Sequence, residues 1–226
     1  AEVFLNEFKT QAQQFNWALE NIGLNPGELV VRLDADEFFD STAIQNLRSF
    51  KEEEASDVIG LSFNRRIIFQ GEHVRFGGLS NKWIVRAFVY PFGQSNGRLM
   101  DEHITVRGSI TKVGGCLYDE CLKGIDFWMS KHIKYAQREA IEVLRSASKN
   151  SAYQTFYYLL PSRVRPILFF IRRFIFQIGF LDKQKAKEFH YLQAFWYRQQ
   201  VEKELYRLRS LKQKQREKVI AKYLEL

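Results

Sequence analysis

The sequence predicts an α/β fold, because strand-like segments alternate with helix-like ones along a chain of 226 residues. Short apolar runs rich in β-branched and aromatic residues are separated by segments whose apolar residues recur at helical spacing. Glycine and proline punctuate the connections between these segments. A chain of this length buries a full core, as one large domain or as a domain with an appendage.

The first part of the chain has the pattern of a helix followed by a strand. Residues 1–22 resemble an amphipathic helix, which Asn25-Pro26-Gly27 interrupts. In the stretch ELVVRLDADEFFD that follows, the apolar run over residues 29–33 predicts a buried, parallel strand. A parallel sheet needs further strands, so we expect that the chain begins inside a domain and that earlier strands precede it.

Further elements are expected in regular order. Asp40-Ser41-Thr42 has the composition of a helix N-cap and precedes a helix expected over residues 43–55. Residues 57–69 predict a strand, and the run KWIVRAFVY at residues 82–90 predicts another. Residues 126–148 carry apolar side chains at helical spacing and predict a long helix.

Three acidic side chains, Asp34, Asp36 and Glu37, come directly after the first predicted strand. In open α/β sheets ligands bind beyond the carboxyl ends of the strands, so these acids are expected at a ligand-facing edge. Carboxylates at the mouth of a core need a positive partner, and a hard divalent cation is the simplest candidate. The alternative is that the acids begin a turn and cap the next helix, but Asp40 supplies a better cap. We therefore predict a metal site for a phosphorylated substrate.

Two further groups of residues are chemical candidates. Asp101, Glu102 and His103 follow a turn-like segment and offer a general base with a neighbour that ligates metal or orients the base. A solvated loop is the alternative for this group. Lys131 and His132 lie in the predicted long helix, where they either bind a diphosphate or belong to the wet face of an amphipathic helix.

The net charge of +8 is concentrated in the C-terminal part of the chain. Residues 161–226 contain 16 Lys/Arg and 6 Asp/Glu, a local charge of +10, so residues 1–160 are near −2. Such a segment suits an anionic membrane surface, a nucleic acid or an acidic partner. Its apolar residues 166–181 are interrupted by Arg172 and Arg173, which leaves no run near the roughly 20 residues of a spanning helix. The segment is expected either in the headgroup region of an anionic membrane or packed on the catalytic domain.

Five motifs follow one another along the chain: LDADEFF, FNRRIIFQGEHVRFGG, a strand-like run carrying Arg86, MDEHITVRG and WMSKHIKYAQREA. In this order they resemble the family 2 glycosyltransferases of bacterial polysaccharide gene clusters. The closing LLPSRVRP and GFLDKQKAKEFHYLQAFWYR resemble the C-terminal part of the same group. The similarity therefore covers nearly the whole chain.

The resemblance implies a GT-A fold, that is, a mixed sheet flanked by helices, with a helical basic extension. Residues 1–150 would form a partial catalytic domain and residues 151–226 the extension. The implied reaction moves a sugar, with inversion, from a nucleotide-diphosphate sugar to a saccharide or lipid-linked acceptor and uses Mg or Mn. The implied location is cytoplasmic, at the inner face of the cell membrane.

The resemblance also assigns roles to residues. Asp36 would hold the metal between the two phosphates, with Asp34 on the ribose or metal side and His103 as a further metal ligand. Glu102 or Asp101 matches the acidic motif that removes the proton of the acceptor hydroxyl, and Glu102 is preferred.

Three basic or neutral side chains, Arg86, Lys131 and His132, are assigned by the same resemblance to binding of the nucleotide-sugar donor. Family members carry earlier strands that recognise the base and ribose, and nothing in this chain corresponds to them. We therefore expect the chain by itself to bind the donor poorly.

Two rival functions belong to other classes. A basic nucleic-acid-binding protein would use the acids as a two-metal nuclease site, and its binding would fall steeply with salt. The basic segment lacks a recognisable nucleic-acid-binding motif, so no nucleic acid is expected as a partner. The third reading is a non-enzymatic scaffold in which the DADE sequence is vestigial.

Overall fold

The computed structural model describes residues 3–50, 58–79, 82–97, 103–146 and 159–225. The chain forms two compact units: the first contains Ala1–Ile67 and Ser80–Glu120, and the second contains Ile68–Leu79 and Cys121–Leu226. These units have other boundaries than the catalytic domain expected over residues 1–150. The assignment of catalysis to residues 1–150 stays a prediction. The chain is a mixed α/β protein, as the sequence predicts.

Within the described residues, six strands form one sheet in the order β1-β5-β3-β8-β2, with β4 paired to β3 outside this path. Their bounds are β1 (Leu29–Val31), β2 (Glu37–Phe39), β3 (Val58–Phe69), β4 (Glu72–Val74), β5 (Lys82–Val89) and β8 (Ser109–Glu120). A separate hairpin pairs β6 (Gly93–Ser95) with β7 (Ile104–Val106). The strands expected at residues 57–69 and 82–90 are thus confirmed as β3 and β5.

The strand before the acidic motif differs from its prediction. β1 pairs antiparallel with β5, with Leu29 opposite Val89 and Val31 opposite Ala87. It has β5 as its neighbour at one end of the described strand order, and Val31 is 41% exposed. The prediction of a buried parallel strand is therefore wrong, because a short apolar run does not determine the direction of its partner. The acids consequently lie in the loop between β1 and β2, not at the carboxyl edge of a parallel sheet.

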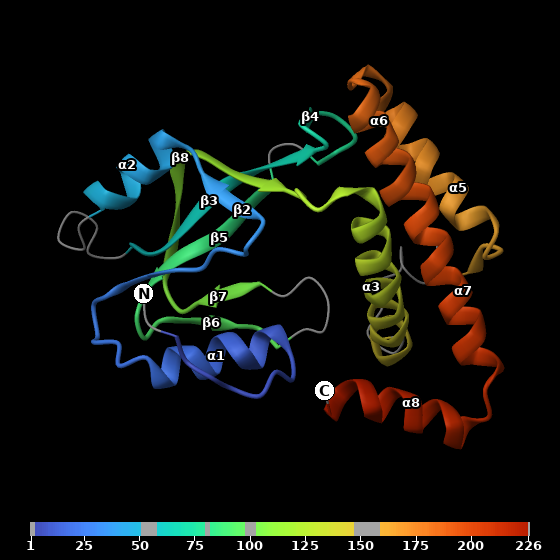
Figure 1. Cartoon of the computed structure of the whole chain (residues 1–226), viewed down its shortest axis with the longest axis horizontal. Helices are drawn as coiled ribbons and strands as arrows, with labels where there is room; N and C mark the ends of the chain where they lie inside the picture. Colours follow the sequence, from blue (N-terminus) through green and yellow to red (C-terminus); the bar gives the residue numbers. More distant parts are fainter. Residues whose placement is uncertain (1–2, 51–57, 80–81, 98–102, 147–158, 226) are drawn as a thin grey trace. The chain divides into compact units, whose positions relative to one another are not determined.

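The described part of the first unit contains the helices α1 and α2 (Figure 1). α1 (Gln11–Asn21) starts later than expected, at an N-cap in which the Thr10 hydroxyl accepts a hydrogen bond from the Gln13 amide. α2 (Ser41–Ser49) begins at the predicted N-cap: the Asp40 carboxylate accepts from the Ala43 amide at 2.8 Å. The second carboxylate oxygen of Asp40 accepts from the Cys116 amide at 2.9 Å, which ties α2 to β8.

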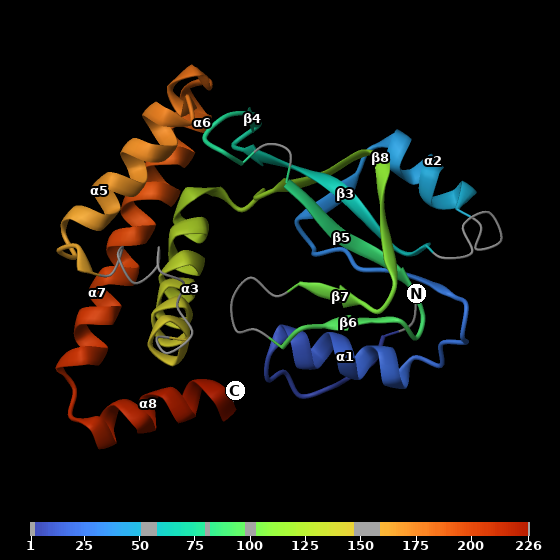
Figure 2. The ribbon, with the colours of Figure 1, turned by 180° about the vertical axis from the view of Figure 1, so that it is seen from behind.

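One core cluster of the first unit lies between the sheet and α2, and Figure 2 shows α2 beside β8 from behind. Leu61 and Phe63 on β3 point to one face because side chains alternate along a strand. They are 1% and 0% exposed and pack with Ala43, Ala87 and Leu117. Burying side chains of this size stabilises the fold by about 1.5–3 kcal/mol each.

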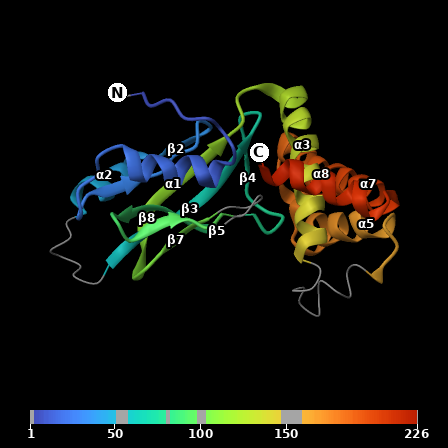
Figure 3. The ribbon, with the colours of Figure 1, turned by 90° about the horizontal axis from the view of Figure 1, so that it is seen from below.

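The second unit is mainly helical. Within the described residues its helices are α3 (Gly124–Ser146), α5 (Val164–Ile171), α6 (Gln184–Tyr191), α7 (Tyr197–Ser210) and α8 (Gln213–Glu225). Figure 3 shows α3, α5 and α7 side by side, and both α3 and α5 contact α7. Shorter pieces join them: the π-helical η3 (Arg172–Phe176) and η5 (Leu192–Trp196), and the 3₁₀ turn η4 (Gly179–Leu181). In the described part of the chain, no helix has the length and apolarity needed to cross a membrane.

The buried carboxylate of Asp182 joins a loop to a helix in the second unit. The side chain of Asp182 is 1% exposed, and its oxygens accept from the backbone amides of Arg75 and Phe76 at 3.0 and 3.1 Å. The Nε2 of His190 lies 2.8 Å from the same carboxylate, and burial lowers the pKa of His190. Gly77 completes this contact at φ +70°, where a Cβ atom would overlap the His190 ring. The RFGG sequence of the second motif therefore has a structural role in docking its loop onto the helices.

Replacing Asp182 with alanine is expected to lower the free energy of unfolding by about 3–5 kcal/mol, because two buried amides and His190 lose their acceptor. Urea denaturation measures this change. Glu188→Ala serves as the control, since Glu188 is half-exposed in an ion pair with Lys185 and should cost less than about 1 kcal/mol. Equal losses in the two variants would contradict the proposed role of Asp182.

Candidate functional site

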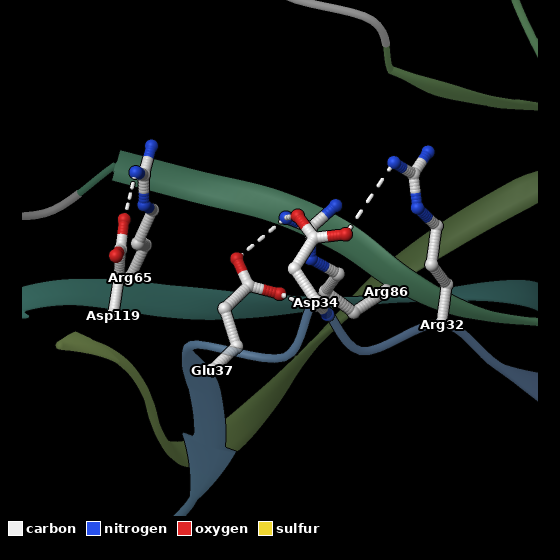
Figure 4. Close-up of polar contacts among 6 residues, drawn as sticks. All are labelled: Arg32, Asp34, Glu37, Arg65, Arg86 and Asp119. Carbon is white, nitrogen blue, oxygen red and sulfur yellow. Dashed lines mark hydrogen bonds and ion pairs between the residues drawn. The ribbon is translucent and has the colours of Figure 1, made fainter. Parts of the chain in front are cut away.

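The loop between β1 and β2 forms an ion-pair network in the first unit (Figure 4). The guanidinium Nη2 of Arg86 lies 2.6 Å from Glu37 Oε1 and 3.4 Å from Asp34 Oδ2. The Nη2 of Arg32 lies 3.5 Å from the other oxygen of Asp34. The second oxygen of Glu37 accepts from the Asp34 amide at 3.2 Å, so the acidic loop folds back on itself. Two arginines thus flank the carboxylate of Asp34.

A β-bulge positions Arg86 in this network. The pairing of β3 with β5 passes from Leu61 opposite Ala87 to Ser62 opposite Val85, so Arg86 is the extra residue on β5. Bulges re-aim side chains and are frequent beside functional sites. The backbone carbonyl of Arg86 also accepts from the Arg32 amide at 2.8 Å, which continues the β1–β5 pairing past the end of β1. The bulge therefore positions Arg86 at the acidic loop, and the hydrogen bond to its carbonyl holds Arg32 beside it.

The acids of the network differ in burial. The side chains of Glu37 and Arg86 are 3% and 10% exposed, whereas that of Asp34 is 41% exposed. A buried ion pair that loses one partner leaves an uncompensated charge, so Glu37 and Arg86 hold the fold together. Asp34 is accessible and its contacts to the arginines are long, so its oxygens can exchange these contacts for those of a ligand. Of the acids in this loop, Asp34 thus has the features expected of a functional residue.

A second ion pair lies beside the first. Glu37 is directly opposite Asp119 in the antiparallel pairing of β2 with β8, and like charges in such positions repel. Arg65 of the FNRR sequence on β3 forms an ion pair with Asp119, as Arg86 does with Glu37. Figure 4 shows all these side chains on the same side of the strands. Each acid of the opposed pair therefore has its own arginine.

Asp36 lies in the same loop and is partly buried. Its backbone carbonyl accepts from the Glu120 amide at 2.8 Å, which extends the pairing of β2 with β8 by one residue. This bond fixes the backbone of the acidic loop two residues beyond Asp34. The Asp-x-Asp sequence is therefore held at both ends of its backbone, by the β1–β5 pairing and by the β2–β8 pairing.

The predicted metal ligands are not assembled as a group in the structure. In the part of the chain that the structure describes, no group of three or more His, Cys, Asp or Glu side chains could hold a metal ion. Asp34, Asp36 and His103 therefore do not form such a group. His103 is exposed ahead of β7, and its backbone amide donates to the Asn96 side chain at 3.2 Å. Asp101 and Glu102, the predicted bases, lie outside the described residues.

The charge argument for a metal changes with this geometry. The sequence predicts a positive partner for these acids, with a divalent cation as the simplest candidate. The structure supplies Arg32 and Arg86 to Asp34, and Arg86 to Glu37. These charges cancel, so stability alone requires no cation at these two acids. The Mg or Mn prediction now rests on the resemblance and on the chemistry of the exposed oxygens.

Lys131 and His132 lie on α3, which belongs to the second unit. The His132 ring stacks on Trp128 with 3.5 Å between centroids, and its Nδ1 lies 2.7 Å from the Trp128 carbonyl. Burial lowers the pKa of His132 to about 4, so the ring is neutral near pH 7 and donates through Nδ1. The Lys131 ammonium lies 5.6 Å from the centroid of the Tyr135 ring. His132 therefore has the environment of a packing residue, and it brings no positive charge for a diphosphate.

Sequence reasoning singled out Asp34, Asp36 and Arg86 but gave no role to Arg32 or Asp119. Arg32 carried a usable signal, because an arginine inside an otherwise apolar run needs a carboxylate partner nearby. Asp119 carried none, because its pairing with Arg65 depends on which strands become neighbours.

A scan against models of known protein families finds no match to this chain, and a search of curated proteins finds no significant match either. The resemblance to family 2 glycosyltransferases therefore stays a hypothesis based on the order of the motifs.

Glu37 and Asp34 should respond differently to removal of charge. Glu37→Ala is expected to cost about 3–5 kcal/mol of unfolding free energy, because Arg86 would be left buried without its close partner. Asp34→Asn is expected to cost less than about 1 kcal/mol, because its contacts to the arginines are long and its own side chain is 41% exposed. Urea denaturation of both variants checks this contrast. A larger loss for Asp34→Asn than for Glu37→Ala would show that Asp34 is the structural residue.

The lowered pKa of His132 predicts a pH dependence of stability. An unfolded histidine takes up a proton near pH 6.5, whereas folded His132 does so only near pH 4. Between these pH values the unfolded chain binds more protons than the folded protein. The free energy of unfolding therefore falls as the pH falls, by about 3 kcal/mol in total. His132→Phe should remove this contribution and keep the ring stacking on Trp128. Urea denaturation from pH 7 to pH 4 measures it, and parallel pH profiles of the two proteins would contradict the buried neutral state.

Proposed function

We propose that this protein is an inverting glycosyltransferase of family 2 type, which moves a sugar from a nucleotide-diphosphate donor to a saccharide acceptor in cell-surface polysaccharide synthesis. The observation that supports the proposal is the contact between separated motifs. Asp34 of LDADEFF meets Arg86, 52 residues away, at the side of the sheet where Arg65 of the FNRR sequence also lies. Residues that share a function need such convergence, whereas unrelated motif matches do not predict it.

The donor would bind at the acidic loop with Mg or Mn. Magnesium commonly uses one or two protein carboxylates together with substrate phosphates, so Asp34 and Asp36 would be enough without a third ligand. The cation, when bound, would stabilise the charge that develops on the departing diphosphate. Asp36 is proposed as its ligand, with Asp34 on the metal or ribose side.

Arg32 and Arg86 would keep this loop ready for the donor. Their contacts at 3.5 and 3.4 Å hold the Asp34 carboxylate in place and balance its charge while no donor is bound. The buried Nε of Arg86 has no acceptor within the described residues, and a water or phosphate oxygen would satisfy it after a small shift. Guanidinium groups suit phosphate oxygens because they offer several N–H donors in one plane.

The acceptor half of the proposal rests on Glu102, or its neighbour Asp101, as the base that removes the proton of the attacking hydroxyl. The hydroxyl would attack from the face opposite the leaving diphosphate, which inverts the anomeric carbon. We further propose that the sheet is of the GT-A type, that the acceptor is lipid-linked, and that the enzyme works at the cytoplasmic face of a bacterial membrane.

Isothermal titration of UDP and GDP, with and without Mn, tests the donor half of the proposal. Binding of the diphosphate is expected to require Mn. Asp36→Ala should abolish it, since the diphosphate would lose its metal contact.

The matched control is Asp119→Asn, which alters the Arg65 ion pair on the same side of the sheet and leaves the Asp34 and Asp36 side chains unchanged. This variant should keep the Mn-dependent binding. Absence of Mn-dependent binding, or equal binding by wild type and Asp36→Ala, would contradict the proposal. Salt-sensitive binding of nucleic acid instead would favour the rival function.

A further inference from the structure

The segment formed by α5 and η3 is apolar on two faces, although only one of them is packed. On the inner face, Phe170 stacks on Phe174 at 5.0 Å between centroids and contacts Phe195. Arg173 on this face is 7% exposed, and its Nε donates to the Gly77 carbonyl. This face satisfies the packing of the segment against the rest of the second unit.

The opposite face of the same segment is exposed, and we define the outer apolar face by its exposed side chains together with that of Ile178, which follows η3. They are Val164, Ile167, Leu168, Ile175, Phe176 and Ile178. Most of them recur at intervals of three and four residues, which places them on one side of a helix. Phe176 is 78% exposed and Ile175 is 54% exposed. A helix that is apolar all round is normally buried. The outer apolar face is instead exposed in the folded unit, as surfaces that bind a partner are.

Ile178 indicates that the outer apolar face has a role other than stabilising the fold. Its backbone lies in the left-handed region at φ +52° and ψ +29°, which is a strained conformation for a β-branched residue. Glycine or asparagine would end the helix there with less strain. The isoleucine side chain is nevertheless 42% exposed and contributes little to the core. Strained residues of this kind are concentrated at functional sites.

The charges around the outer apolar face are nearly all positive. Residues 161–187 contain seven Lys/Arg and one carboxylate, Asp182, which is buried against His190. Arg165 is also buried, in an ion pair with Glu202 at 2.7 Å. Arg163, Arg172 and Lys183 are exposed at the borders of the face. An apolar surface bordered by exposed cations complements anionic lipid.

We infer that the outer apolar face is the surface by which this protein binds an anionic lipid bilayer. Phe176 and Ile178 enter the boundary between headgroups and acyl chains, while Arg172 and Lys183 contact the lipid phosphates. The protein then lies on the bilayer surface, in agreement with the lack of a spanning helix in the described part of the chain. The inference rests on residues of the second unit alone and does not depend on the proposed glycosyltransferase activity.

Co-sedimentation with vesicles tests this inference on the full chain. Wild type should bind vesicles of phosphatidylcholine mixed with phosphatidylglycerol, and bind phosphatidylcholine alone much more weakly. Phe176→Ser should weaken binding about tenfold or more, because the protein loses an aromatic side chain that enters the bilayer. Leu122→Ser is the control, since Leu122 is 81% exposed in the same unit but lies outside the face.

Ile178→Asn separates lipid binding from a structural role of the face. Asparagine tolerates the left-handed conformation, so the thermal midpoint should be unchanged or higher, while vesicle binding should fall. A lower midpoint with unchanged vesicle binding would overturn the inference.

Two further results would also overturn it. One is equal binding of wild type to both kinds of vesicle. The other is a dimer in analytical ultracentrifugation that Phe176→Ser dissociates while leaving vesicle binding intact, which would assign the face to a second copy of the chain.

Discussion

The ion pair between Arg86 and Glu37 connects the parts of the first unit that surround the acidic loop. Arg86 comes from the bulge of β5, and Glu37 opens β2, so the pair joins one side of the sheet order to the other. Glu37 also faces Asp119 across the β2–β8 pairing, and the repulsion between them is offset because each has an arginine. With these charges satisfied, Asp34 remains both anchored and accessible. The candidate site therefore depends on a structural pair that does not itself need to touch a ligand.

The second unit also contains a buried carboxylate with polar partners, and these side chains are less exposed than those of the Arg86–Glu37 pair. Asp182 satisfies two backbone amides of the loop that contains Gly77, and it holds the ring of His190. This arrangement docks a short loop onto α6 and the segment around η3, and so helps to fix the inner face of that segment. The outer apolar face is what remains once this packing is complete. In both units, buried charge determines the fold locally, and the adjoining exposed residues are available for binding.

The acidic motif illustrates how a correct observation led to an incomplete inference. The sequence shows three acids after an apolar run, and the need for a positive partner follows from the cost of burying charge. A cation was the simplest partner because Arg86 lies some fifty residues away and its proximity depends on the strand order. The Lys131-His132 pair gives a similar lesson, since helical spacing allowed either a wet face or a ligand site. Stacking on Trp128 and the low pKa of His132 favour packing instead.

The sequence by itself determined the α/β class, the cap of α2 at Asp40, the existence of β3, β5 and α3, and the interruption of the apolar C-terminal segment by arginines. These features follow from local periodicity and capping, which act over a few residues. Only the tertiary structure decided that β1 is antiparallel, that Arg86 sits in a bulge beside Asp34, and that one face of α5 and η3 stays exposed. Each of these depends on which distant segments become neighbours, and a pattern confined to a short stretch of chain carries no information about that choice.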